Sequence, residues 1–285
     1  MDGVKKIGEE FYSSGGSGTD PIFPALKRLS VMGMRGLVEW MIPAAIAGGV
    51  QVVFPCLEEL YIERCPKLES IPSMSHLSSK LVRLTIRDCD ALSHISDEFQ
   101  ASATSLKYLT IMRCSNLESI PSLQSCIALE ALSISTCNNL ASSIILESRS
   151  LISVFIGWCR KASVRISWPL SYANMKELNI ELCGELIFSD DLHGEVWPSR
   201  FQSLVIRCCD QFKSVPDGLK RRLHSLVRSA FSCSIRYQLV SKFKSYSGRF
   251  LSRPQPIEGI ENRWFLAGIG GNSWNEFNPT PGRHP

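Results

Sequence analysis

The sequence lacks several features that would point to export, membrane insertion or phosphate chemistry. No apolar run reaches the roughly 18–20 residues needed to cross a bilayer, and the first residues, 1–16, have no signal-peptide core. There is no usable Asn-x-Ser/Thr site, because Pro279 follows Asn278. A Gly-x-x-x-x-Gly-Lys-Ser/Thr loop, whose backbone donors cradle phosphate, is also missing. We therefore expect a cytoplasmic chain without a nucleotide site or a membrane anchor.

The sequence also lacks a strong excess of one charge. The formal net charge is +4, from 31 Lys and Arg against 27 Asp and Glu. Residues 1–229 hold 24 basic and 24 acidic side chains, so the small excess belongs to residues 230–285, with 7 and 3. A nucleic-acid partner would need a concentrated basic face to displace counterions from phosphates. This balance argues against such a partner.

Patterns typical of metal sites and catalysis are absent as well. The chain has 11 cysteines but no Cys-x-x-Cys pair, and its 5 histidines occur singly, outside any zinc-ligand or nucleophile motif. We therefore predict no catalytic residue, no metal, no small-molecule cofactor and no enzymatic activity.

A repeated unit is what the sequence does contain. The pattern Leu-x-x-Leu-x-Ile-x-x-Cys, with apolar substitutes, recurs at intervals of 22 to 26 residues, and the Cys always lies eight residues after the first apolar position. A period of this length is typical of solenoids. The seven units start at Leu57, Leu81, Leu106, Leu129, Leu151, Met175 and Phe201. A divergent eighth unit at Leu26 has Met34 in place of the Cys and is followed by an insertion.

Each unit predicts a short strand whose second Leu and Ile point inward. One strand cannot bury its own inner face, whereas stacked units form a parallel sheet with a continuous core. A second apolar anchor follows the Cys, and several units end in Ser-Ile-Pro or Ser-Val-Pro. We therefore predict an α/β leucine-rich repeat solenoid. It should have a curved parallel sheet on its concave face and irregular loops with short helical turns on its convex face.

The recurring cysteines are expected to be structural. They lie where the chain leaves each strand, so that stacking should form an internal ladder of small buried side chains. The cytosol favours reduced thiols over disulfides at these positions. The ladder comprises Cys65, Cys89, Cys114, Cys137, Cys159, Cys183 and Cys209. Cys208 should face outward and is the thiol to test for reactivity.

Three regions follow from the extent of the repeat. Residues 1–22 are the end of a preceding repeat or a flexible N-terminal segment. Residues 23–220 form the array of about eight units. The tail 221–285 is rich in Ser, Gly, Pro and Arg and should be partly disordered.

The repeat resembles that of a known family. Its consensus, and phrases such as Val4–Tyr12 and Phe54–Glu58, are similar to the leucine-rich repeats of plant intracellular nucleotide-binding disease-resistance proteins of the coiled-coil class. The resemblance covers residues 4 to about 220 and implies a fragment or truncated product without the nucleotide switch. It also implies protein recognition in plant defence. The partner would be a pathogen effector, a guarded host protein or a neighbouring nucleotide-binding domain held inactive.

Outward strand positions on the concave face are the expected binding surface, since a rigid sheet displays them in register. Exposed aromatic and arginine side chains dominate binding hot spots. The candidates are Tyr61, Arg83, Arg87, Tyr108, Arg113, Phe155, Trp158 and Glu177. Each could also be an ordinary solvated side chain.

Two other functions remain open at this point. Substrate receptors of ubiquitin ligases also use Cys-bearing leucine-rich repeats, although the Ser-Ile-Pro tails disfavour that class. The chain could instead be a non-functional truncated paralogue. Extracellular receptor repeats are disfavoured by the missing glycosylation sites.

Overall fold

A computed structural model gives the structure of the protein. It describes residues 3–12, 23–42, 53–73, 77–78, 80–95, 103–166, 174–188, 202–209, 211–212 and 234–238. The chain divides into two units, residues 1–241 and 242–285, and all described residues belong to the first. Phe201, the insertion after Ile42 and most of the tail predicted at 221–285 lie outside the described residues.

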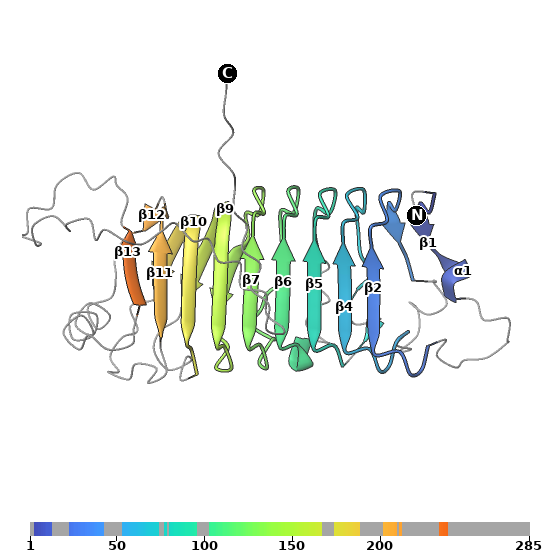
Figure 1. The fold of residues 1–285 in the computed structure, drawn as a ribbon, viewed down its shortest axis with the longest axis horizontal. Helices are drawn as coiled ribbons and strands as arrows, with labels where there is room; N and C mark the ends of the chain where they lie inside the picture. The colour runs from blue at the N-terminus through green and yellow to red at the C-terminus, as the bar shows by residue number, and fades with distance from the viewer. Residues whose placement is uncertain are drawn as a thin grey trace, which may run out of the picture. The chain divides into compact units, whose positions relative to one another are not determined.

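Residues 1–241 are built on parallel strands that follow the repeat, with one strand in each repeat unit (Figure 1). Neighbouring strands pair in sequence order and in register along their first five residues, so that Leu60 faces Leu84 and Leu84 faces Leu109. We call this row the main sheet. It comprises β2 (Arg28–Met32), β4 (Glu59–Glu63), β5 (Arg83–Arg87), β6 (Tyr108–Met112), β7 (Ala131–Ser135), β9 (Ser153–Ile166), β10 (Glu177–Phe188), β11 (Ser203–Arg207) and β13 (Ser234–Gln238).

The inward positions of these strands form the core, as the sequence predicts. From β4 to β11 the second Leu and the Ile of each unit, or Val154 in β9, are 5% exposed or less. The second anchors Leu68, Leu92, Leu117 and Leu140 are fully buried as well. Complete burial of one such side chain stabilises the fold by about 1.5–3 kcal/mol. The core therefore runs through the array as one cluster.

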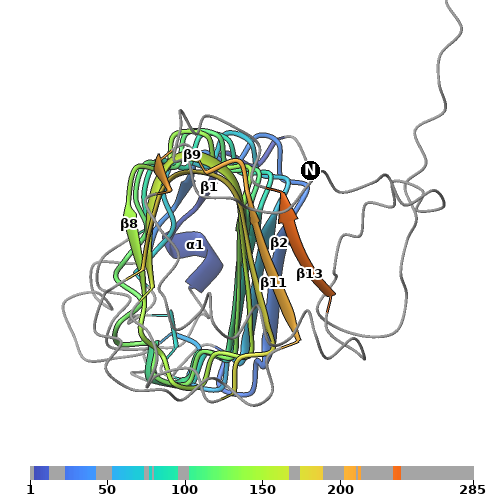
Figure 2. The ribbon, with the colours of Figure 1, turned by 90° about the vertical axis from the view of Figure 1, so that its left-hand side faces the viewer.

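The opposite side of the coil carries a second parallel ladder instead of helical turns. After each ladder Cys from Cys65 to Cys137 the chain makes a tight turn, in which Leu68 N–H donates to Cys65 O at 3.1 Å and Leu117 N–H to Cys114 O at 3.2 Å. It then hydrogen-bonds to the neighbouring unit, as Glu118 N–H does to Ser93 O at 2.8 Å. Figure 2 shows this side across from the main sheet.

The prediction of short helical turns on the convex face is therefore wrong for the described residues. The helical residues described in the whole chain are the four-residue helix α1 (Glu9–Tyr12), the 3₁₀ turn Ala103–Ser105 and Leu77. Units of 22 to 26 residues leave about a dozen residues for the return path. Backbone pairing between neighbouring units satisfies their polar groups, so that a helix is not needed.

The ladder becomes full strands toward the C-terminal units. β9 and β10 run through the turn without interruption, and their later halves pair with β8 (Ser143–Leu146) and β12 (Gln211–Phe212). Gly184 lies at the register shift between β9 and β10. A Cβ atom at this position would lie 2.5 Å from the carbonyl oxygen of Arg160, so only glycine allows the two backbones to approach.

Residues 3–12 pack onto the first unit of the array. β1 (Lys6–Ile7) pairs in parallel with β3 (Glu39–Trp40), in a two-stranded sheet of its own. Tyr12 of α1 is 3% exposed and accepts a hydrogen bond of 2.7 Å from the Trp40 indole nitrogen. The segment thus shares the core of the repeats rather than standing apart from it.

Candidate functional site

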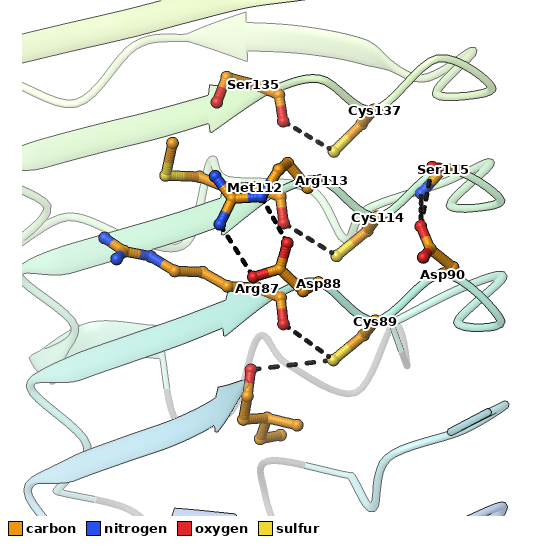
Figure 3. Close-up of polar contacts among 11 residues, drawn as sticks. Arg87, Asp88, Cys89, Asp90, Met112, Arg113, Cys114, Ser115, Ser135 and Cys137 are labelled. Atoms are coloured by element: carbon orange, nitrogen blue, oxygen red, sulfur yellow. Dashed lines mark hydrogen bonds and ion pairs between the residues drawn. The ribbon is translucent and has the colours of Figure 1, made fainter. Parts of the chain in front are cut away.

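Six of the seven ladder cysteines are buried, Cys209 is half-buried, and their thiols donate to backbone carbonyls. Each sulfur lies near the carbonyl oxygen two residues earlier, at 3.3 Å for Cys89 and 3.5 Å for Cys114 (Figure 3). Cys89 also reaches Ile62 O of the preceding unit at 3.8 Å. From Cys65 to Cys183 the ladder side chains are 1% exposed or less. These weak contacts fill the turn and link neighbouring units.

Hydrogen bonding between neighbouring ladder thiols shifts their pKa values in opposite directions, lowering that of Cys137 and raising that of Cys114. Hydrogen bonding to Cys137, together with burial, raises the pKa of Cys114 far above its ordinary value. Burial alone raises the pKa of Cys126 to about 11. No disulfide joins the described cysteines, and no described group of three or more Cys, His, Asp or Glu side chains is arranged to hold a metal ion. The ladder thiols from Cys65 to Cys183 are therefore closed off from solvent, and a structural role for the ladder stays a prediction.

The residue before each ladder Cys has a left-handed backbone. Its φ is positive in every unit, between 50° and 57°, although none of the seven residues is a glycine. They are Arg64, Asp88, Arg113, Thr136, Trp158, Leu182 and Cys208. In the divergent first unit the place belongs to Gly33, with φ 67°. Only glycine, and to some degree Asn and Asp, adopts this conformation without strain.

This left-handed residue decides which side chains face the solvent. Simple alternation from Ile156 would place Trp158 inside and Cys159 outside. The left-handed turn shifts the alternation by one residue, so that Trp158 is 36% exposed and Cys159 is fully buried. The N–H groups of the left-handed residues continue the parallel ladder, as Arg64 N–H does to Arg87 O and Thr136 N–H does to Gly157 O, both at 2.9 Å. Each unit therefore has four positions on this side of the sheet, although Thr85, Ala131 and Ser135 among them are buried.

We call the resulting surface the open face. It consists of the first, third and fifth residues of each main strand from β4 to β11, together with the left-handed residue that follows. The eight candidates all lie on it: Tyr61 on β4, Arg83 and Arg87 on β5, Tyr108 on β6, Phe155 on β9, Glu177 on β10, and Arg113 and Trp158 at left-handed positions. Only Arg113, Trp158 and Glu177 are exposed, and the other five are half-buried.

Most carboxylates of the first strands already have partners. Glu59 accepts from Arg28 Nε at 2.6 Å and from Tyr61 Oη at 3.2 Å. Glu130 contacts the Lys107 ammonium at 2.8 Å. Exposed pairs of this kind contribute little stability, because solvent screens them. They do decide which charges remain available to a partner.

Asp88 and Arg113 form a two-point pair across neighbouring units. Arg113 Nε donates to Asp88 Oδ1, and its terminal nitrogen donates to Oδ2 at 2.8 Å (Figure 3). These hydrogen bonds outweigh partial burial and hold the pKa of the Asp88 carboxyl below its ordinary value. Arg113 is therefore paired with Asp88. The sequence analysis, which predicted it as an outward binding residue, did not predict this ion pair.

An uncharged zone lies at the centre of the open face. The eight outward positions of β7 and β9 carry no charge: Ala131, Ser133, Ser135, Thr136, Ser153, Phe155, Gly157 and Trp158. The rings of Phe155 and Trp158 lie 6.0 Å apart at 52°, and a Cβ on Gly157 would come within 3.0 Å of the Phe155 ring. An aromatic pair thus lies beside a patch of small side chains.

The sequence analysis predicted Phe155 and Trp158 as binding residues but did not predict the patch of small side chains. Small side chains carry no hot-spot signal of their own, although their in-register pairing, Ser133 with Phe155 and Ser135 with Gly157, follows from the constant spacing of the units. A search for runs of uncharged outward positions would have found the zone.

These features define the chain as a parallel β-solenoid repeat protein with one ordered, side-chain-rich face. The described residues include no helix with the length and hydropathy of a membrane-spanning segment. No protein-family model matches the chain. A protein of Arabidopsis thaliana that is named as a disease resistance protein is 31% identical over 110 residues. This match covers 36% of the chain and 7% of the Arabidopsis protein, so the chain is similar to a small part of a much longer relative.

Proposed function

We propose that the chain is a protein-recognition module in plant defence that binds its partner through the open face. The partner would be a pathogen protein, a guarded host protein or a neighbouring nucleotide-binding domain that is held inactive. The likeness to a disease resistance protein supports the setting. The resemblance of the repeats to intracellular coiled-coil-class resistance proteins supports a cytoplasmic location.

The observation that carries the proposal is the Phe155–Trp158 pair within the uncharged zone. An indole that is 36% exposed and rests 6.0 Å from a second ring contributes little to the core of its own unit. Aromatic side chains that are ringed by polar groups are the usual centres of protein interfaces. A partner that covers the pair would remove apolar area from water without burying a charge.

Site-specific photocrosslinking in plant tissue tests the proposal. A photoreactive residue is placed at Ser153 on the open face, and in a matched variant at Ser143 on β8, on the opposite side of the coil (Figure 2). We expect a discrete crosslinked protein with the first variant and none with the second. The purified partner should then bind the Trp158→Ala variant at least tenfold more weakly. Equal crosslinking from both faces, or unchanged binding, would refute the proposal.

A further inference from the structure

The arginines of β5 form no ion pair within the described residues, as is also true of Arg64. Arg83 and Arg87 lie at the two ends of the strand and face the solvent side together. Within the described residues neither forms an ion pair, whereas Arg28, Arg113 and Lys107 each do. Glu63 is the in-register neighbour of Arg87, but no ion pair joins them.

The two guanidinium groups have different surroundings. Arg83 lies over the Tyr108 ring with its central carbon 4.2 Å from the ring centre, which fixes the plane of the guanidinium. Arg87 extends away from the Asp88–Arg113 pair (Figure 3), and its Nε is buried without a described acceptor. A buried donor without an acceptor costs free energy that a bound acceptor would recover.

The surroundings favour an extended ligand over a compact one. Arg83, Thr85 and Arg87 alternate along one strand, so a partner chain that lies along β5 meets them at the spacing of its own alternate residues, about 3.3 Å per residue. Tyr61 and Thr110 flank Thr85 in register and provide polar and aromatic side walls. Carboxylates match the fork of an arginine better than any other side chain.

We infer that β5 binds an extended acidic segment of the partner protein, whose carboxylates on one side pair with Arg83 and Arg87. The inference rests on the proposed recognition function and adds the chemistry of the partner. Glu59 and Asp88 lie close enough to act electrostatically on Arg83 and Arg87, but their ion pairs are with Arg28 and Arg113, so a ligand carboxylate would displace no ion pair of the described residues.

Selection from a phage-displayed library of random 12-residue peptides tests the inference on the full chain. The wild-type protein is compared with an R83Q/R87Q double variant. The control variant is R149Q/R165Q, which removes the same charge from two exposed arginines that are not on the open face. We expect selected peptides to carry Asp or Glu at positions two or four apart.

Synthetic copies of the selected peptides then provide the measurement. We expect binding at least tenfold weaker to R83Q/R87Q, within twofold of wild type for R149Q/R165Q, and lost when the peptide acids become amides. An R83K/R87K variant, which keeps the charge but not the fork, should lie in between. Circular dichroism checks that each variant is folded, and if R83Q/R87Q does not fold, the lysine variant and the amide peptides decide.

Three outcomes would overturn the inference. Selected peptides that are apolar and depend on Trp158 would leave the recognition function standing and reject the acidic partner. A 12-residue oligouridylate that binds more tightly than every selected peptide, with the same dependence on Arg83 and Arg87, would replace it with a nucleic acid. A library that yields no binder would also reject it, while the crosslinking from Ser153 judges the recognition function separately.

Discussion

The left-handed residue in each unit predicts that a glycine will stabilise the protein at Thr136, directly after β7, and destabilise it at Ser133 within β7. Thr136 has φ 57°, and a β-branched residue is a pronounced outlier there. Left-handed backbone costs a non-glycine residue about 1–2 kcal/mol. Glycine also gains freedom in the unfolded chain, which lowers stability by about 0.4–1 kcal/mol. Thr136→Gly should therefore raise the free energy of unfolding by about 0.5–1 kcal/mol, from these two terms.

Two matched variants isolate the cause. Ser133→Gly lies in the extended part of the same strand, where glycine should cost about 0.5–1 kcal/mol. Thr136→Val keeps the branched Cβ and removes only the hydroxyl, so it should leave stability nearly unchanged. Urea denaturation followed by circular dichroism gives the free energies, and the melting temperature should rise by about 1–4 °C for Thr136→Gly. If both glycine variants lose stability equally, the strain argument is wrong.

Three further predictions follow from the described contacts. Gly184→Ala should lower the free energy of unfolding by about 1–3 kcal/mol, since the new Cβ meets the Arg160 carbonyl oxygen, and an unchanged urea midpoint would contradict this. Asp88→Asn should destabilise the protein at neutral pH, because Arg113 lowers the pKa of the folded Asp88 carboxyl. That difference should be present above the ordinary aspartate pKa and disappear as the pH falls through the folded pKa, and a difference that is constant with pH would count against it. Cys208 is exposed, so Cys208→Ser should remove one fast equivalent from labelling of the native protein by a thiol reagent, while labelling that stays the same would show another thiol to be the reactive one.

The constant spacing within the units was enough to predict much of the structure. Leu60, Ile62 and their equivalents alternate with variable positions, so one face had to be buried and the strands had to stack in register. The return path was harder to predict. Short helical turns were expected, and the structure has a second parallel ladder, because the pairing partner of Glu118 or Ser143 is a neighbouring unit distant in sequence. Local propensity carries no information about such a partner.

The sequence alone thus determined the repeat, the parallel sheet, the core and the burial of the cysteines, since all of these depend on apolar periodicity. Only the tertiary structure decided what the surface offers. The left-handed conformation at Trp158 exposes its side chain and buries Cys159, and no glycine in the sequence indicates this conformation. Backbone hydrogen bonds to neighbouring units impose it. The pairing of Asp88 with Arg113, and the absence of an ion pair at Arg83 and Arg87 within the described residues, depend on side-chain directions across β5 and β6. Such side-chain directions follow from packing between units, and the spacing of residues along the chain does not predict them.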